Sequence, residues 1–183
     1  LGSPKVKADA IRTRMTRSIN MKWDENPLYY KKFSARIEET LQAYKDKRIS
    51  EKEYFARMND LKKDYQEGYS DIKYPDNIKN QPDAQAFYGA TVSAFTEAKG
   101  AYGERVDAGL SKEQIAELSL QVVEIVAKHT KVDWHDNLDV HNRIDQEVED
   151  LLFDFTDAND IILNFGQIDK ILREIKTVAL SRY

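Results

Sequence analysis

The sequence predicts an all-α protein, a single domain of about seven helices in which a helical hairpin and a bundle surround one core. Apolar residues recur every three or four positions through most of the 183 residues, which is the period of amphipathic helices. Seven Gly and four Pro provide few of the turns that a β-rich fold needs. Hydrophobic residues make up 41% and charged residues 33% of the chain, as expected when each helix buries one stripe.

The first segment is predicted to be a basic helix over residues 5–22. Ile11, Met15 and Ile19 recur at every fourth position and form a narrow apolar stripe, so we expect this helix to lie outside the core. Residues 1–4 resemble an expression-vector remnant and are left out of the predicted fold. The sequence also lacks an initiator Met, so we expect a fragment of a longer protein.

Residues 27–67 are predicted to form an antiparallel helical hairpin. Asn26 and Pro27 supply a cap and a proline at the first helical position. Ser50 and Glu53 have the spacing of a capping box that starts the second helix, and Gly68 suits its C-terminal cap. The two apolar faces consist of Tyr30, Phe33, Ile37, Leu41 and Tyr44, and of Tyr54, Met58, Leu61 and Tyr65.

Residues 69–82 are predicted to be a loop, and residues 83–183 a C-terminal helical bundle. A long helix is expected after Pro82, with its stop at Gly109. A second capping box over 111–114 opens the next helix. Helical spacing resumes at Val140, residues 160–163 form one turn or a buried extended piece, and an amphipathic helix closes the chain.

The signatures of several enzyme classes are missing, so no catalytic residue and no enzyme activity are predicted for this region. The chain has no phosphate-binding P-loop, no G-x-S-x-G elbow and no Cys. No apolar run is long enough to span a membrane, and no signal peptide opens the sequence. We therefore expect a cytoplasmic location and no membrane partner.

Two clusters contain residue types that bind metals but lack the spacing or residue order of a metal site. His129, His135 and His141 stand six residues apart, whereas helical zinc ligands stand three or four apart. Asp154, Asp157 and Asp160 have helical spacing but lack the order of a calcium loop. No metal ligand is predicted. The favoured interpretation of the carboxylates is a face exposed to solvent or to a partner.

The basic helix is the candidate DNA-binding element. It carries a net charge of +5 in eighteen residues, since Asp9 is its one acid. Basic side chains at this density neutralise phosphates and release counterions, which gives sequence-independent affinity for DNA. An acidic protein surface, including the acidic stretch of this chain, is an equally open alternative. The candidate residues are Lys5, Lys7, Arg12, Arg14, Arg17 and Lys22.

The stretch from residue 133 to residue 160 has the opposite charge, with ten acids against a single base. Trp134 stands at its start, where the helical pattern breaks, and is predicted to fill a core while its indole N–H bonds a carboxylate or carbonyl. Arg143 is predicted to pair with Asp133 or Asp139 and to fix the approach of two helices. Direct contact of this motif with a partner is the alternative.

Several short motifs resemble, in their order, the C-terminal helical region of the motor (R) subunit of type I restriction-modification enzymes. The similarity covers most of the chain from Ala8 to Tyr183. The motifs are Glu25-Asn26-Pro27-Leu28-Tyr29-Tyr30, Ala86-Phe87-Tyr88, Gly109-Leu110-Ser111, Lys131-Val132-Asp133-Trp134, Val140 to Arg143, Val148-Glu149-Asp150-Leu151-Leu152 and Ile168-Asp169-Lys170-Ile171-Leu172.

The resemblance implies a parent subunit with a nuclease domain and two helicase-like motor domains, an ATP-dependent type I site-specific deoxyribonuclease. It implies that this region docks the motor onto the methyltransferase core and assists duplex DNA binding during translocation and cleavage. The expected partners are the methyltransferase and specificity subunits, duplex DNA and the remainder of the motor subunit. No cofactor is expected here, and ATP and Mg²⁺ would belong to the parent. The alternative is a purely structural scaffold without DNA contact.

Overall fold

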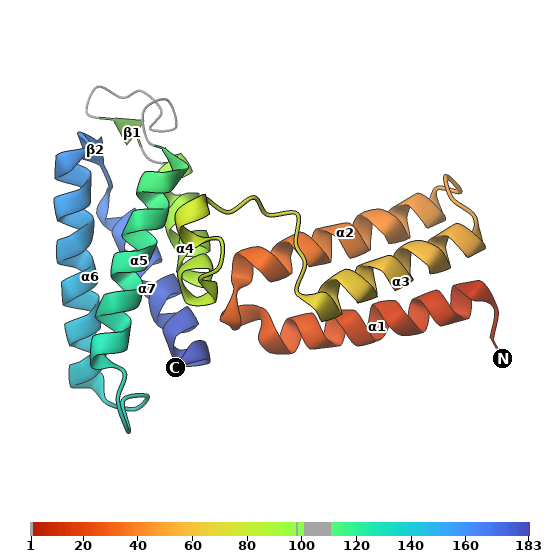
Figure 1. Cartoon of the computed structure of the whole chain (residues 1–183), viewed down its shortest axis with the longest axis horizontal. Coiled ribbons are helices and arrows are strands. Elements are labelled where there is room, and N and C mark those ends of the chain that lie inside the picture. The colour runs from red at the N-terminus through yellow and green to blue at the C-terminus, as the bar shows by residue number, and fades with distance from the viewer. Residues whose placement is uncertain (1, 98, 101–110) are drawn as a thin grey trace. The chain divides into compact units, whose positions relative to one another are not determined.

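A computed structural model describes residues 2–97, 99–100 and 111–183 (Figure 1). The long helix expected from Pro82 to Gly109 is shorter than predicted: it ends at Glu97, and residues 99–100 are extended, while Gly109 itself lies outside the described residues. The chain divides into two compact units. Unit 1 contains residues 1–23 and 27–73, and unit 2 contains residues 24–26 and 74–183.

Unit 1 is a three-helix bundle of α1 (Pro4–Lys22), α2 (Pro27–Lys45) and α3 (Glu51–Glu67). Helices α1 and α3 run parallel, because the Tyr54 hydroxyl lies 3.1 Å from Asp9 Oδ1 while the Ser18 and Tyr65 hydroxyls lie 2.8 Å apart eleven residues further along α3. Helix α2, which lies between α1 and α3 in the sequence, runs in the opposite direction to both (Figure 1). Arg36 ties α2 to α3 through a 2.7 Å hydrogen bond to Asp64.

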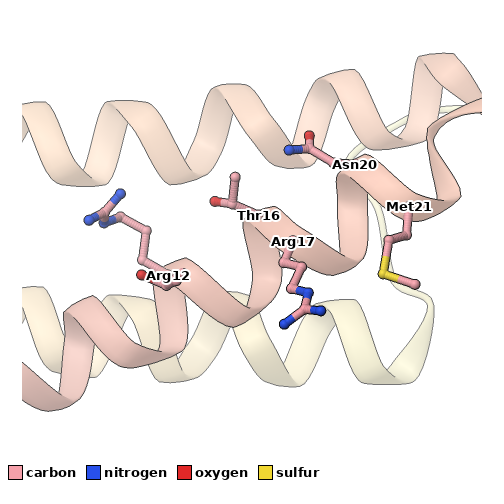
Figure 2. Close-up of a pocket in the computed structure, with 6 residues that line it drawn as sticks. Arg12, Thr16, Arg17, Asn20 and Met21 are labelled. Atoms are coloured by element: carbon pink, nitrogen blue, oxygen red, sulfur yellow. The ribbon is translucent and has the colours of Figure 1, made fainter.

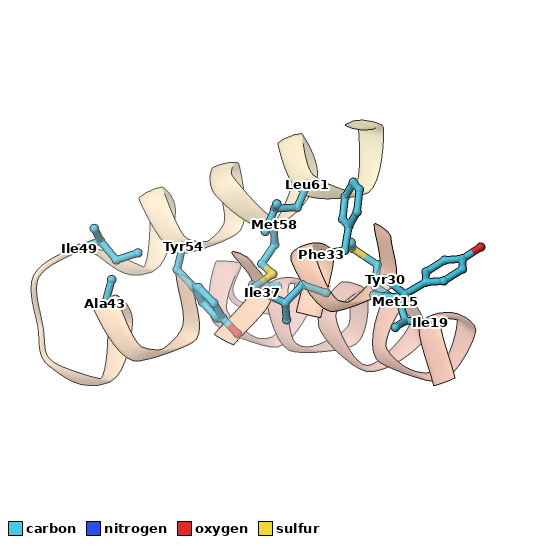
Figure 3. Close-up of a cluster of buried hydrophobic side chains, with 11 residues drawn as sticks. Met15, Ile19, Tyr30, Phe33, Ile37, Ala43, Ile49, Tyr54, Met58 and Leu61 are labelled. Carbon is cyan, nitrogen blue, oxygen red and sulfur yellow. The ribbon is translucent and has the colours of Figure 1, made fainter. Parts of the chain in front are cut away.

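The core of unit 1 contains side chains from all three helices (Figure 3). Helix α1 contributes Ala8, Met15 and Ile19 to it, so the prediction that this helix lies outside the core is wrong. The partly buried Ile11 packs against the same cluster, so all three residues of the predicted apolar stripe contact the core. The other buried members are Tyr30, Phe33, Ile37, Ala43, Ile49, Tyr54, Met58 and Leu61.

Local capping explains where the helices of unit 1 begin and end. The Ser50–Glu53 capping box is present with both of its hydrogen bonds, at 2.7 and 3.2 Å. Gly68 ends α3 at a φ of 70°, a left-handed conformation that favours glycine. Ser3 accepts a hydrogen bond from the Val6 N–H, and Pro4 is the first residue of α1. Ser3 and Pro4 therefore cap this helix, although residues 1–4 were not included in the predicted fold.

Unit 2 contains α4 (Pro82–Glu97), α5 (Lys112–His129), α6 (Leu138–Ala158) and α7 (Phe165–Arg182). Short 3₁₀ helices lie at Trp23–Glu25, where the units meet in sequence, and at Asp76–Ile78. The strands β1 (Lys99–Gly100) and β2 (Ile161–Ile162) form an antiparallel pair. Residues 161–162 are thus extended, one of the two outcomes expected for that segment, and Ile161 is buried.

The packing of unit 2 joins α4 to α5 and α7, α5 to α6, and α6 to α7. Arg182 on α7 donates to Asp83 on α4 at 2.6 and 2.9 Å, and to the Glu25 carbonyl at 3.1 Å. The larger buried side chains of unit 2 include Ile78, Phe87, Phe95, Leu118, Val122, Leu152, Ile171 and Ile175.

The predicted class is confirmed: the fold is all-α, with seven α-helices in the described part of the chain. Both predicted capping boxes are present, at 50–53 and at 111–114. A single hydrophobic core was predicted. In the structure, each of the two units has its own set of buried hydrophobic side chains. No helix among the described residues is long and apolar enough to cross a membrane.

Candidate nucleic-acid interface

The basic helix α1 is packed along one face, and this packing decides which of its cations remain available. Ala8, Met15 and Ile19 are buried on the face that contacts the core of unit 1. Because a helix turns by about 100° per residue, the cations are distributed over the remaining faces and not on a single side. The six predicted residues therefore fall into groups with different surroundings.

Two of the six cations are next to the single acid of the helix. Lys5 Nζ lies 2.7 Å from Asp9 Oδ2, and Arg12 Nε lies 3.8 Å from Asp9 Oδ1. The hydrogen bond from Lys5 lowers the pKa of Asp9 below its ordinary value of 3.8, with a further contribution from the Tyr54 hydroxyl, while burial opposes both. The same hydrogen bond raises the pKa of Lys5. Lys5 and Arg12 are thus partly neutralised in the free protein.

The remaining four cations are exposed. Lys7 Nζ lies over the Phe55 ring of α3, 5.9 Å from its centroid, so it leans toward α3. Arg14, Arg17 and Lys22 form no ion pair or hydrogen bond with the described residues. Positions 7, 14 and 17 share one flank of the helix, because seven residues make about two turns and three residues about one. Lys7, Arg14 and Arg17 are the cations of this flank.

A shallow hollow of about 460 Å³ lies on the outer face of α1, open to solvent (Figure 2). Arg12 and Arg17 stand on its two sides, and in the picture Arg17 points toward α3. The polar side chains of Thr16 and Asn20, both exposed, also line the hollow. Guanidinium, hydroxyl and amide groups are the donors that contact phosphate oxygens in DNA complexes. The composition and spacing of the charges could not identify Thr16 and Asn20, because both side chains are uncharged.

Charge is segregated between the two units as well as along the chain. Unit 1 contains 17 Lys and Arg against 10 Asp and Glu, a net charge of +7. Unit 2 contains 11 against 22, a net charge of −11. The acidic protein of net charge −4 therefore has a basic unit, and the three unpaired cations of the α1 flank belong to it. A polyanion is attracted to this unit and repelled by the other.

The acidic stretch lies mainly on α6 of unit 2. Glu147 accepts hydrogen bonds from Lys128 and from His129 Nε2, and the bond from Lys128 is the main cause that lowers its pKa. Asp145 pairs with Lys176 of α7. Five further carboxylates of α6 have no ion pair in the described structure: Asp139, Glu149, Asp150, Asp154 and Asp157.

Several large apolar side chains of unit 2 are exposed. Phe153 of α6 is 44% exposed, three residues after Asp150 and four before Asp157 on the same face. Phe165, the first residue of α7, is 82% exposed, and Ile162 of β2 is also exposed. Val132 and Leu138 are exposed at the turn between α5 and α6. The periodicity of the sequence did not identify these residues, because it does not separate a core aromatic from a surface one.

Trp134 is buried, 3% exposed, as predicted for a side chain that fills a core, and it contacts the rings of His135 and His141. Its predicted hydrogen bond is not formed within the described structure, where the indole Nε1 has no hydrogen-bond partner. The predicted pairing of Arg143 with Asp133 or Asp139 is wrong: Arg143 is exposed and forms no ion pair with the described residues. Asp133 adopts a φ of 63°, which makes a tight turn before the Trp.

Among the described residues, no group of three or more His, Asp or Glu side chains could hold a metal ion. His129 is bonded to Glu147, whereas His135 and His141 pack against Trp134.

Comparison with known proteins identifies a family for the chain. Residues 1–161 match the family model described as "Type I restriction enzyme HindI endonuclease subunit-like, C-terminal". No curated protein and no solved structure matches the chain. The match covers all of unit 1 and most of unit 2, including α1, the acidic helix α6 and Trp134.

Proposed function

Since this chain belongs to the C-terminal family of type I restriction enzyme endonuclease subunits, we propose that it attaches the motor to the rest of the enzyme and helps to hold duplex DNA. Docking onto the methyltransferase core is assigned to unit 2, and contact with duplex DNA to unit 1. ATP-driven translocation and cleavage, with their Mg²⁺, are assigned to the remainder of the parent subunit.

The segregation of charge is the observation that carries the DNA role. Unit 1 has a net charge of +7, and Lys7, Arg14 and Arg17 are exposed on one flank of α1 without acidic partners among the described residues. Neutralisation of phosphates by such side chains releases condensed counterions, which supplies affinity without a sequence requirement. A motor that moves along DNA needs contacts of this kind, since they are the same at every step.

The docking role rests on the surface of unit 2. Protein interfaces are enriched in aromatic side chains, and unit 2 exposes both Phe153 and Phe165, with Phe153 on the same face of α6 as the unpaired Asp150 and Asp157. Its net charge of −11 disfavours contact with DNA and favours a basic protein surface. We assign the methyltransferase core as the occupant, because the family places this region in a multisubunit restriction enzyme.

The substitution Asp9→Asn is expected to tighten duplex binding by several-fold at about 0.1 M salt. Asn keeps an acceptor for the buried Tyr54 hydroxyl but removes the charge that neutralises Lys5 and Arg12. Fluorescence anisotropy with a labelled duplex of about 30 base pairs measures the change. Asp60→Asn is the matched control, an exposed carboxylate of α3 outside this cluster, and should change the affinity less.

If neither variant nor the unmodified chain binds the duplex at low salt, the DNA role is wrong and the scaffold function takes its place. If both variants tighten binding equally, the effect reflects net charge alone, and the assignment of the contact to α1 is wrong.

A further inference from the structure

We propose that the DNA contact extends from α1 onto α3 through Lys62, so that one strand of the duplex lies along the line where α1 and α3 pack. This inference rests on the function proposed for unit 1 and adds a residue that the charge pattern of α1 does not include. We call the set Lys7, Arg14, Arg17 and Lys62 the seam cations. The ligand class is the phosphate backbone of duplex DNA.

The parallel packing of α1 and α3 fixes the position of Lys62. Lys7 Nζ lies 5.9 Å from the centre of the Phe55 ring, so position 7 of α1 is level with position 55 of α3. The hydrogen bond between Ser18 and Tyr65 keeps nearly the same offset at the other end of the pair. A step of seven residues, about two turns, leads from Lys7 to Arg14 and from Phe55 to Lys62. Lys62 is therefore level with Arg14 across the seam.

The environment of Lys62 leaves its charge available. Its side chain is exposed, and no ion pair or hydrogen bond to the described residues holds it. It follows Met58 and Leu61, which are buried, so its stem starts at the edge of the packed face of α3. Lys63 is also exposed and has no partner in the described structure, but it lies about 100° further round the helix. The two lysines thus differ in direction and in little else.

The length of the seam suits a short run of phosphates. Lys7 and Arg17 are ten residues apart, roughly 15 Å along α1. One DNA strand presents a phosphate about every 3.4 Å of helix axis, so more than one phosphate falls within this length. Phosphate contacts carry no sequence information, so the surface should bind unrelated sequences equally.

The test compares Lys62→Gln with Lys63→Gln in the 183-residue chain, using a fluorescein-labelled duplex of about 30 base pairs. Each phosphate contact contributes a factor of about eight to the binding constant at 0.1 M salt, so Lys62→Gln should weaken binding roughly fivefold to tenfold. It should also reduce the slope of log K against log salt by about one. Lys63→Gln should stay within about twofold of the unmodified chain with its slope unchanged.

Equal effects of the two substitutions, or no effect of Lys62→Gln on affinity and slope, would overturn the extension onto α3. Substitution of Arg14 and Arg17 separates this failure from that of the proposed function. If those substitutions weaken binding and Lys62→Gln does not, α1 binds DNA without α3. If none of them weakens binding, the DNA role itself is wrong. Circular dichroism of each variant checks that the helices are retained.

Discussion

Reversal of two charges, Arg14→Glu together with Arg17→Glu, is expected to weaken duplex binding at least a hundredfold at about 0.1 M salt. Loss of two phosphate contacts accounts for a factor of about 60, since each contributes about eight under these conditions. The two new carboxylates add repulsion from the phosphates. Both side chains are exposed and have no partners among the described residues, so the helix should stay folded. Fluorescence anisotropy on the labelled duplex measures the loss.

The matched control is Lys31→Glu together with Lys32→Glu on α2. These lysines are exposed in the same unit, and the substitutions change the net charge by the same amount. Salt screens charges that lie more than about 10 Å from the ligand at 0.1 M, so the control should lose far less affinity. Equal losses for the two pairs would contradict the assignment of the contact to α1. Arg12 is not included, because its Nε is buried and its side chain lies against Asp9.

The substitutions Phe153→Ser and Phe165→Ser are each expected to weaken binding of the parent subunit to the methyltransferase core about tenfold or more. Aromatic side chains at the centre of a protein interface often cost 2 kcal/mol or more when truncated, which is roughly thirtyfold in affinity. Both rings are exposed in the free chain, so their removal should cost little folding stability. Isothermal titration calorimetry between the purified parent subunit and the methyltransferase core measures the change.

Met21→Ser supplies the control for this experiment, since Met21 is 79% exposed and belongs to unit 1. It should leave the affinity for the methyltransferase core unchanged. The two Phe substitutions should in turn leave the affinity for duplex DNA unchanged. Unaltered assembly of both Phe variants would show that unit 2 docks through another surface, or does not dock at all.

The helix boundaries could be predicted because they depend on local chemistry. The Ser50–Glu53 box and Gly68 satisfy backbone groups within a few residues of themselves, so their spacing in the sequence is enough. The same holds for the box at 111–114. The place of α1 was predicted wrongly, because a stripe of Ile11, Met15 and Ile19 does not reveal that Ala8 and Ser18 complete a face fitted to α3.

Only part of the candidate site could be predicted. The pairing of Asp9 with Lys5 and Arg12 follows from i, i+4 and i, i+3 spacing, so the partial neutralisation of those cations was accessible from the sequence. The position of Lys7 over Phe55 could not be predicted from the sequence. It depends on the register between α1 and α3, and the two residues are 48 positions apart in the chain. Arg143 is the opposite case: acidic residues lie near it in the sequence, but it forms no ion pair with the described residues.

The salt dependence of duplex binding by the 183-residue chain tests most directly whether unit 1 grips the phosphate backbone. Four contacts predict a log–log slope of about −3 to −4 between roughly 0.05 and 0.2 M salt, with the same affinity for two duplexes of unrelated sequence. A slope near zero, or no binding at the lowest salt, would contradict the account and leave a region that binds protein alone.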